Sequence, residues 1–350
     1  MKRDFSPGIP VLLILLLING QVSSQTDKPA QSQESKLNLI TDLVNVEVIV
    51  CDRKTGIPVR GLGKEDFEIY EDGIKQNISH FSNDGLPLSI ILLLDVSGSV
   101  RSVMGEIAEQ AGKTLHQLLS DDEVALMSFR YQAKLCVDFT KDRNLIAEKL
   151  SNPNSLISDP DSELLLDATV IGDSIYQAAE ALRRSSSPPG RRVIIIVTDN
   201  LPDNTGTRYS VRQVANQLME AGCIVYGIRA DQYKSASTSS KVIGSLPTSI
   251  LGDAFYRIIS RHGGNANTYS DLTGGVVLDG RKNKAAEKLA ELIQMLRCRY
   301  SFGYTSSNPV MNGKFRKIKV KLRPEAEKRY GKVTILARQG YFARRPEQAK

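Results

Sequence analysis

The stretch Leu88-Ser89-Ile90-Ile91-Leu92-Leu93-Leu94-Asp95-Val96-Ser97-Gly98-Ser99 decides the fold of this chain. Six of its first seven residues are aliphatic, and this run predicts a strand that is buried on both faces. A carboxylate and two hydroxyls follow at alternate positions, on Asp95, Ser97 and Ser99. Such hard oxygen atoms suit a small divalent cation, and ligands of open α/β sheets gather at the carboxyl ends of strands. We therefore expect these three residues to form the floor of a metal site.

Strands and amphipathic helices alternate after this stretch, as far as residue 297. Further strands are expected at 123–129, 133–139, 193–199, 224–228 and 276–278, and helices at 103–119, 144–150, 171–182, 211–221, 251–262 and 285–296. Residues 231–275 otherwise look irregular. The alternation predicts the α/β class, with a doubly wound and mostly parallel sheet in a domain of residues 86–297.

Short β segments flank this domain on both sides. Residues 40–84 should contain about three strands, at 43–50, 66–70 and 76–81, with Glu71-Asp72-Gly73 as a hairpin turn. Residues 298–343 should contain three more, at 300–305, 315–322 and 332–338. Because neither set can bury a core alone, we expect the two to pair into one small β-sandwich into which the α/β domain is inserted.

The first residues have the pattern of a secretory signal peptide. Lys2 and Arg3 precede an apolar run at 9–18, and small residues lead to a cut near Ser24. The run is shorter than the roughly 20 residues of a spanning helix. Residues 1–24 are therefore predicted to be a signal and 25–39 a disordered linker, which places the chain in the periplasm, the cell envelope or outside the cell. An uncleaved anchor is the alternative, and we expect no membrane span in the mature chain.

The charge is unevenly distributed. The chain has a formal charge of +7, but residues 281–350 contain 19 Lys and Arg against 5 Asp and Glu. A basic segment can indicate nucleic acid or an anionic surface. Here the charges alternate with apolar residues at 314–322, which is typical of the solvated face of a strand, so we expect no nucleic-acid partner.

The remaining reactive residue types argue against an enzyme. Three histidines are scattered, and the sequence has neither a Gly-x-Ser-x-Gly elbow nor a phosphate-binding Gly-rich loop with Lys. No catalytic residue is therefore assigned. The four cysteines, at 51, 136, 223 and 298, match no zinc pattern; buried free thiols and disulfides both stay open.

Two later residues complete the candidate site. Thr169 precedes the helix expected at 171–182, and Asp199 ends the buried strand at 193–199. Asp95, Ser97, Ser99, Thr169 and Asp199 thus supply five oxygen ligands from three loops at one sheet edge. The competing interpretation of the two serines is capping of the helix at 103–119. Asp173 is interpreted as a first-turn carboxylate that suits the helix dipole, and Asp203 as a loop residue.

These five residues resemble the metal-ion-dependent adhesion site of von Willebrand factor type A domains, whose pattern is Asp-x-Ser-x-Ser, then Thr, then Asp. The resemblance covers residues 86–297. Flanking segments, among them 61–73 and 302–305, resemble a related family first described from Acidobacteria. Two residues depart from the usual pattern: Asn200 and Ala168 both stand where Gly is common. Asn tolerates left-handed backbone geometry, so the turn after Asp199 should survive.

The resemblance implies Mg²⁺, with Mn²⁺ or Ca²⁺ as alternatives. It implies that Ser97 and Ser99 bind directly, that Asp95 and Asp199 bind partly through water, and that Thr169 joins when a ligand is present. It also implies a protein partner that supplies a Glu or Asp carboxylate to the metal. The alternatives are a structural envelope protein with a stabilising metal and a metal-dependent hydrolase.

Overall fold

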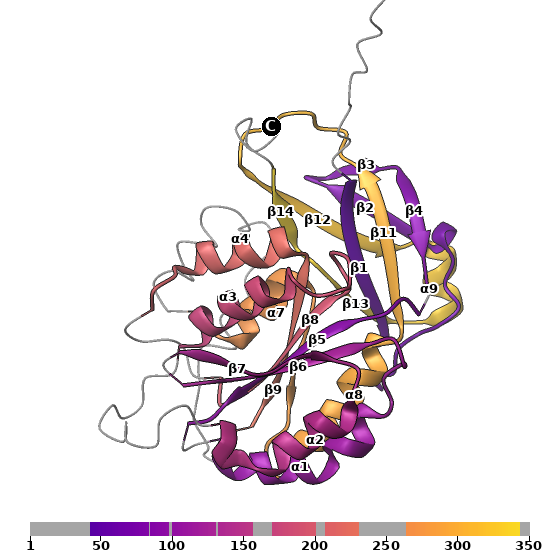
Figure 1. Cartoon of the computed structure of the whole chain (residues 1–350). Helices are drawn as coiled ribbons and strands as arrows, with labels where there is room; N and C mark the ends of the chain where they lie inside the picture. Colours follow the sequence, from indigo (N-terminus) through magenta and orange to yellow (C-terminus); the bar gives the residue numbers. More distant parts are fainter. Residues whose placement is uncertain are drawn as a thin grey trace, which may run out of the picture. The chain divides into compact units, whose positions relative to one another are not determined.

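The computed structural model describes residues 43–83, 85–97, 100–130, 132–156, 170–200, 207–230 and 264–343. These residues form a six-stranded sheet flanked by helices, together with two four-stranded antiparallel sheets (Figure 1). The predicted signal peptide 1–24, the linker 25–39 and the helix expected at 251–262 lie outside the described residues.

The six-stranded sheet has the strand order β10-β9-β8-β5-β6-β7. The strands are β5 (Ser89–Asp95), β6 (Glu123–Phe129), β7 (Ala133–Thr140), β8 (Arg192–Thr198), β9 (Cys223–Arg229) and β10 (Val277–Asp279). Neighbours pair in parallel, except that β7 runs antiparallel to β6. Every residue of β5 is buried, as the apolar run predicts. After β5, the chain adds β6 and β7 on one side of β5 and then β8, β9 and β10 on the other side. The topological switch point of the sheet therefore lies between β5 and β8.

Helices cover both faces of this sheet (Figure 1). On one face lie α1 (Arg101–Leu115), α2 (Arg143–Ser151) and α8 (Ala285–Leu296), and on the other lie α3 (Ile171–Leu182), α4 (Val211–Ala221) and α7 (Ala266–Thr273). The period of two along β5 divides its side chains between the two cores. Leu92 and Leu94 pack with α1 and α8, whereas Ile91 and Leu93 pack with α3 and α4. The predicted doubly wound α/β class is confirmed.

Both ends of the described chain build the other two sheets. Their strands are β1 (Leu43–Asp52), β2 (Phe67–Glu71), β3 (Ile74–Gln76), β4 (Ile78–Ser82), β11 (Arg299–Thr305), β12 (Phe315–Leu322), β13 (Val333–Ala337) and β14 (Gly340–Phe342). The sheet orders are β13-β1-β11-β4 and β14-β12-β2-β3. The two sheets share one core, where the Phe67 ring lies 4.8 Å from Phe302 and 5.3 Å from Tyr300. The α/β domain is therefore inserted into a β-sandwich, as expected.

Several local expectations were wrong. The predicted return strand at 76–81 is two strands: β3 completes the hairpin with β2, and β4 crosses to the other sheet to pair with β11. Asp72 and Gly73, at φ 49° and 87°, form a two-residue turn, so the return strand starts at once. Helix α1 ends at Leu115, four residues before the predicted end at residue 119. Helices α7, α9 (Pro324–Tyr330) and the 3₁₀ turns η1 (Lys64–Asp66) and η2 (Pro153–Leu156) were not predicted.

A polar network ties the sandwich to the amino end of β8. The guanidinium of Arg299 on β11 donates to the Gly190 carbonyl at 2.9 Å, and that of Arg191 donates to the Ser301 hydroxyl at 2.9 Å. Ser301 in turn donates to the carboxylate of Glu47 on β1 at 2.8 Å. Burial raises the pKa of Glu47, and the two arginines act against that shift. These contacts lie at the end of β8 opposite to Thr198 and Asp199.

The four cysteines are all described, and each is a free thiol. Cys51, Cys223 and Cys298 are buried, and Cys136 is half-buried. Burial raises the pKa of the Cys223 thiol to about 12, and it raises that of Cys51 to about 11. Thiols with such a raised pKa are weak nucleophiles at neutral pH, which gives these two a packing role.

Candidate metal centre

Asp95 is the last residue of β5, at the carboxyl edge of the sheet. Its carboxylate is fully buried, with 0 % of the residue exposed. One oxygen, Oδ1, accepts from the backbone N–H of Ser97 at 2.9 Å. The other, Oδ2, accepts from the hydroxyl of Thr198 at 2.9 Å. The side chain is therefore fixed from both sides, by the loop that follows β5 and by the end of β8.

Asp199 comes directly after β8, the parallel neighbour of β5. The register pairs Leu94 with Val197, so both strands end at the same level of the sheet. Asp95 then lies beside Thr198, and Asp199 follows one residue later. Asp199 is 7 % exposed and Ser97 is 8 % exposed. The charge of Asp199 contributes to raising the pKa of Asp95. Asp95, Ser97 and Asp199 thus lie at the carboxyl edge of the sheet, at its switch point, where open α/β folds bind ligands.

The electrostatics of this edge fit a bound cation. Burial, with a smaller contribution from Asp199, raises the pKa of Asp95 to about 6, while hydrogen bonds from Ser97 and Thr198 lower it. A buried carboxylate beside a second carboxylate is unfavourable in its charged form unless a positive charge compensates it. Within the described residues, no group of three His, Cys, Asp or Glu side chains has a metal-binding arrangement. The described donor set of two carboxylates and one hydroxyl is the hard-oxygen type that Mg²⁺, Mn²⁺ and Ca²⁺ accept.

The other predicted ligands, Ser99 and Thr169, lie outside the described residues, as does Asp203. The residue after Thr169 is described. The N–H of Val170 donates to the carbonyl of Arg130, just beyond β6, at 3.0 Å, and α3 then begins at Ile171 as predicted. The backbone next to Thr169 is thereby attached near the carboxyl end of β6, the strand beside β5.

Thr198 supports the candidate site through a contact that the sequence analysis missed. Its buried hydroxyl donates to Asp95 and accepts from the N–H of Asn200 at 3.2 Å. It connects the end of β5 with the segment that follows β8 without being one of the predicted ligands. The available signal was a hydroxyl at the end of an otherwise aliphatic buried strand, where a polar group needs a partner.

Asn200 has the left-handed backbone that was expected of it, with φ 63°. Its side chain adds a contact that glycine cannot make: Oδ1 accepts from the N–H of Ala266, the first residue of α7, at 2.9 Å. Asp173 lies in the first turn of α3, as interpreted, but it also has specific partners. Its carboxylate accepts from the N–H groups of Arg208 and Tyr209 at 2.8 and 3.0 Å.

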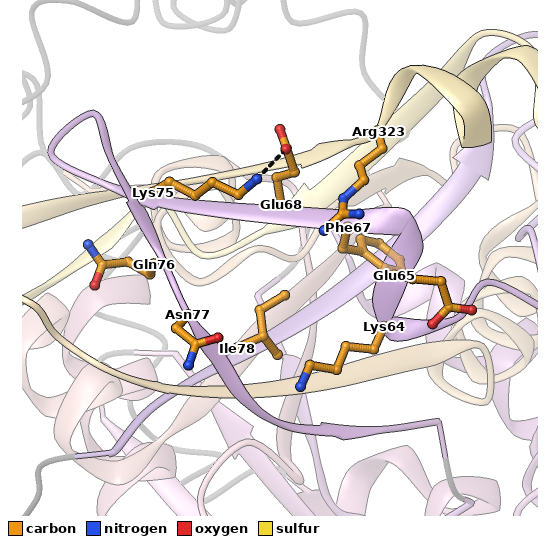
Figure 2. Close-up of a pocket in the computed structure, with 9 residues that line it drawn as sticks. All are labelled: Lys64, Glu65, Phe67, Glu68, Lys75, Gln76, Asn77, Ile78 and Arg323. Carbon is orange, nitrogen blue, oxygen red and sulfur yellow. Dashed lines mark hydrogen bonds and ion pairs between the residues drawn. The ribbon is translucent and has the colours of Figure 1, made fainter.

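The sandwich contains a separate pocket of about 300 Å³. Figure 2 shows its lining side chains, which include Lys64, Glu65 and Arg323, and the ion pair between Lys75 and Glu68 at 2.6 Å. Cations and carboxylates are mixed here, and the pocket shares no residue with the edge formed by Asp95 and Asp199. It is not part of the candidate metal centre.

Residues 90–201 match the family model described as von Willebrand factor type A domain. This segment is a von Willebrand factor type A (VWA) domain. The match includes Asp95, Ser97 and Asp199. No match was found among proteins of curated function. No helix in the described part of the chain is long and apolar enough to cross a membrane.

Several solved structures are similar to this chain at low sequence identity. BatB from Bacteroides thetaiotaomicron is 18 % identical, with 60 % of this chain and 98 % of that chain covered and a TM-score of 0.38. Proximal thread matrix protein 1 from the mussel byssus, described with a zinc-occupied MIDAS motif, is 14 % identical over 63 % of this chain and 48 % of that chain, with a TM-score of 0.40. The pilus adhesin SpaC from Lactobacillus rhamnosus GG is 10 % identical over 81 % and 48 %, with a TM-score of 0.40.

Proposed function

We propose that the VWA domain is an exported, non-enzymatic binding module that holds a divalent cation and captures an acidic side chain of a partner protein through it. Asp95, Ser97, Ser99, Thr169 and Asp199 are the proposed ligands, and Mg²⁺ is the proposed ion, with Mn²⁺ and Ca²⁺ as alternatives. The observation that carries the proposal is the buried Asp95 carboxylate at the switch point of the sheet, which is held by hydrogen bonds from Ser97 and Thr198 and is affected by the charge of Asp199.

The charge and the number of the ligands favour capture of a carboxylate. Two carboxylates and three neutral hydroxyls give five oxygen donors, whereas Mg²⁺ prefers six at about 2.0–2.1 Å. The two formal negative charges come from Asp95 and Asp199, which are expected to bind partly through water. The positive charge of the ion is therefore incompletely compensated, and the ion attracts a further anionic oxygen. A Glu or Asp from another protein can supply that oxygen. The bound ion would supply electrostatic attraction, and the residues around it would set its position.

A pull-down experiment tests this function. The purified chain, without residues 1–24, is immobilised and exposed to envelope extract in Mg²⁺ or in EDTA, beside Asp95→Asn and the exposed control Glu180→Gln. We expect the wild type and Glu180→Gln to retain a protein in Mg²⁺ only, and Asp95→Asn to retain none. Retention that is equal in Mg²⁺ and EDTA would contradict the proposal. Metal binding that raises the melting temperature without any captured protein would support a purely structural metal, and turnover of phosphoester or peptide substrates would support an enzyme.

Export is the second part of the proposal. It rests on the sequence alone, namely on the basic and apolar pattern of residues 1–24, which lie outside the described residues. The protein recovered from the producing cell should begin near Gln25, and N-terminal sequencing measures this. An intact Met1 on protein located in the cytoplasm would overturn export, and an intact Met1 on envelope-bound protein would indicate the uncleaved anchor.

A further inference from the structure

The loop that follows β8 carries Asp199 and leads to α4. We call residues 199–209 the third loop; residues 199–200 and 207–209 of it are described. Each described end is attached to a different element by one buried side chain, Asn200 at the beginning and Asp173 at the end. Neither of these residues is one of the five proposed metal ligands.

At the far end of the third loop, the Asp173 carboxylate uses both of its oxygens. Oδ2 accepts from the N–H of Arg208 at 2.8 Å and Oδ1 accepts from the N–H of Tyr209 at 3.0 Å. Asp173 is only 7 % exposed, and hydrogen bonds to a charged acceptor are stronger than neutral ones. The Tyr209 ring also stacks on Tyr176 of α3, with centroids 3.8 Å apart and planes at 8°. This end of the loop is therefore fastened to the first turns of α3, directly after Thr169.

At the near end, Asn200 links the loop to α7. Its Oδ1 accepts from the N–H of Ala266, which as the first residue of a helix has no partner within that helix. The helix's own cap, Asn265, satisfies a different donor, the N–H of Thr268, at 3.0 Å. Asp199 thus lies between two fixed neighbours, because Thr198 is bonded to Asp95 and Asn200 is bonded to α7.

We infer that Asp173 and Asn200 are positioning residues for the metal site: Asn200 fixes the backbone directly after Asp199 against α7, and Asp173 fixes residues 208–209 against α3. This inference rests on the proposed metal site and deepens it. Glycine at this position would provide the left-handed backbone of Asn200 without the side-chain acceptor. In this chain, Asn200 therefore couples the metal loop to α7, so binding of the ion should also stabilise the start of that helix.

Asn200→Gly separates conformation from contact, because glycine keeps φ near 63° and removes only the amide. Asp173→Asn keeps the shape of the side chain and one acceptor, and Asp173→Ala removes both. Glu180→Gln, exposed on the same helix as Asp173, is the control. Calorimetric titration with Mn²⁺ should give an affinity about 5-fold lower for Asn200→Gly and about 10- to 100-fold lower for Asp173→Ala, with Asp173→Asn between wild type and Asp173→Ala.

A second readout separates positioning from general stability. Hydrogen exchange should show that Mn²⁺ protects the amides at 266–269 in the wild type and in Glu180→Gln, and that this protection is lost in Asn200→Gly. Wild-type affinity in both Asn200→Gly and Asp173→Asn, or the same metal-induced protection in Asn200→Gly as in the wild type, would overturn the inference while leaving the metal site in place. A wild-type protein that binds no divalent cation would overturn both the site and the inference.

Discussion

Asp95→Asn should make the metal-free protein more stable while it removes metal binding. Asp95 is fully buried, and its pKa of about 6 lies above the ordinary value of 3.8 because of burial and the nearby charge of Asp199. At pH 7.5 the folded protein therefore carries an unfavourable charge. Asparagine has the same shape, can still accept from the N–H of Ser97, and carries no charge. With 1.36 kcal/mol per pKa unit, we expect a gain in the free energy of unfolding of about 2–3 kcal/mol.

The pH dependence of this gain has a defined sign. Because the folded pKa is raised, the cost of the Asp95 charge is complete above about pH 6 and disappears below the ordinary value of 3.8. The advantage of Asp95→Asn should therefore shrink as the pH falls from 7.5 to 4.5. Urea unfolding in EDTA, followed by circular dichroism, measures it at both values. If Asp95→Asn is less stable than the wild type at pH 7.5, the charge of Asp95 does not destabilise the metal-free protein.

Loss of Glu71 should strongly destabilise the sandwich. Glu71 on β2 is 2 % exposed and accepts from the hydroxyls of Tyr304 and Tyr341 at 2.8 and 2.9 Å. It also forms a buried ion pair of 3.2 Å with Arg316. Glu71→Ala leaves a buried guanidinium, the buried hydroxyl of Tyr304 and the half-buried hydroxyl of Tyr341 without this acceptor, and breaking a buried pair in this way costs about 3–5 kcal/mol. The partners lie on β11, β12 and β14, so this variant also tests whether the two ends of the chain depend on each other.

The matched control is Glu68→Gln on the same strand. Glu68 pairs with Lys75 at 2.6 Å, but the Lys75 side chain is exposed, and such surface pairs contribute about 0–1 kcal/mol. Thermal unfolding followed by circular dichroism should show a much lower melting temperature for Glu71→Ala and almost none of that shift for Glu68→Gln. If Glu71→Ala fails to fold, Glu71→Gln keeps an acceptor and should be intermediate. Equal melting temperatures for Glu71→Ala and Glu68→Gln would contradict this account of the sandwich.

The sequence predicted those elements whose apolar residues recur with a clear period. Helices α3, α4 and α8 begin and end at the predicted residues, because each has a long buried apolar stripe. Helix α7 has mostly small and polar buried residues, among them Thr268 and Ser270, so periodicity could not detect it. The change of sheet between β3 and β4 was also missed, since local turn chemistry does not show which strand a segment will pair with.

The candidate site was predictable where it follows from strand ends. Asp95 and Asp199 each end a buried apolar run, and parallel pairing of β5 with β8 puts both at the same edge of the sheet. The supporting contacts left weaker signals or none. The partners of Asp173 are backbone N–H groups, which every residue except proline has, so no residue type in the sequence identifies them. Asn200 was correctly predicted to keep the turn, but its contact with α7 depends on an element that was not predicted.

Calorimetric titration of the metal-free wild type and Asp95→Asn with Mg²⁺, and with Mn²⁺ in a parallel series, tests the central claim most directly. The wild type should bind one ion per chain, and Asp95→Asn should bind at least about 100-fold more weakly although it is correctly folded and more stable in EDTA. Equal affinity of the two proteins, or no binding by the wild type, would contradict a metal centre at the carboxyl ends of β5 and β8.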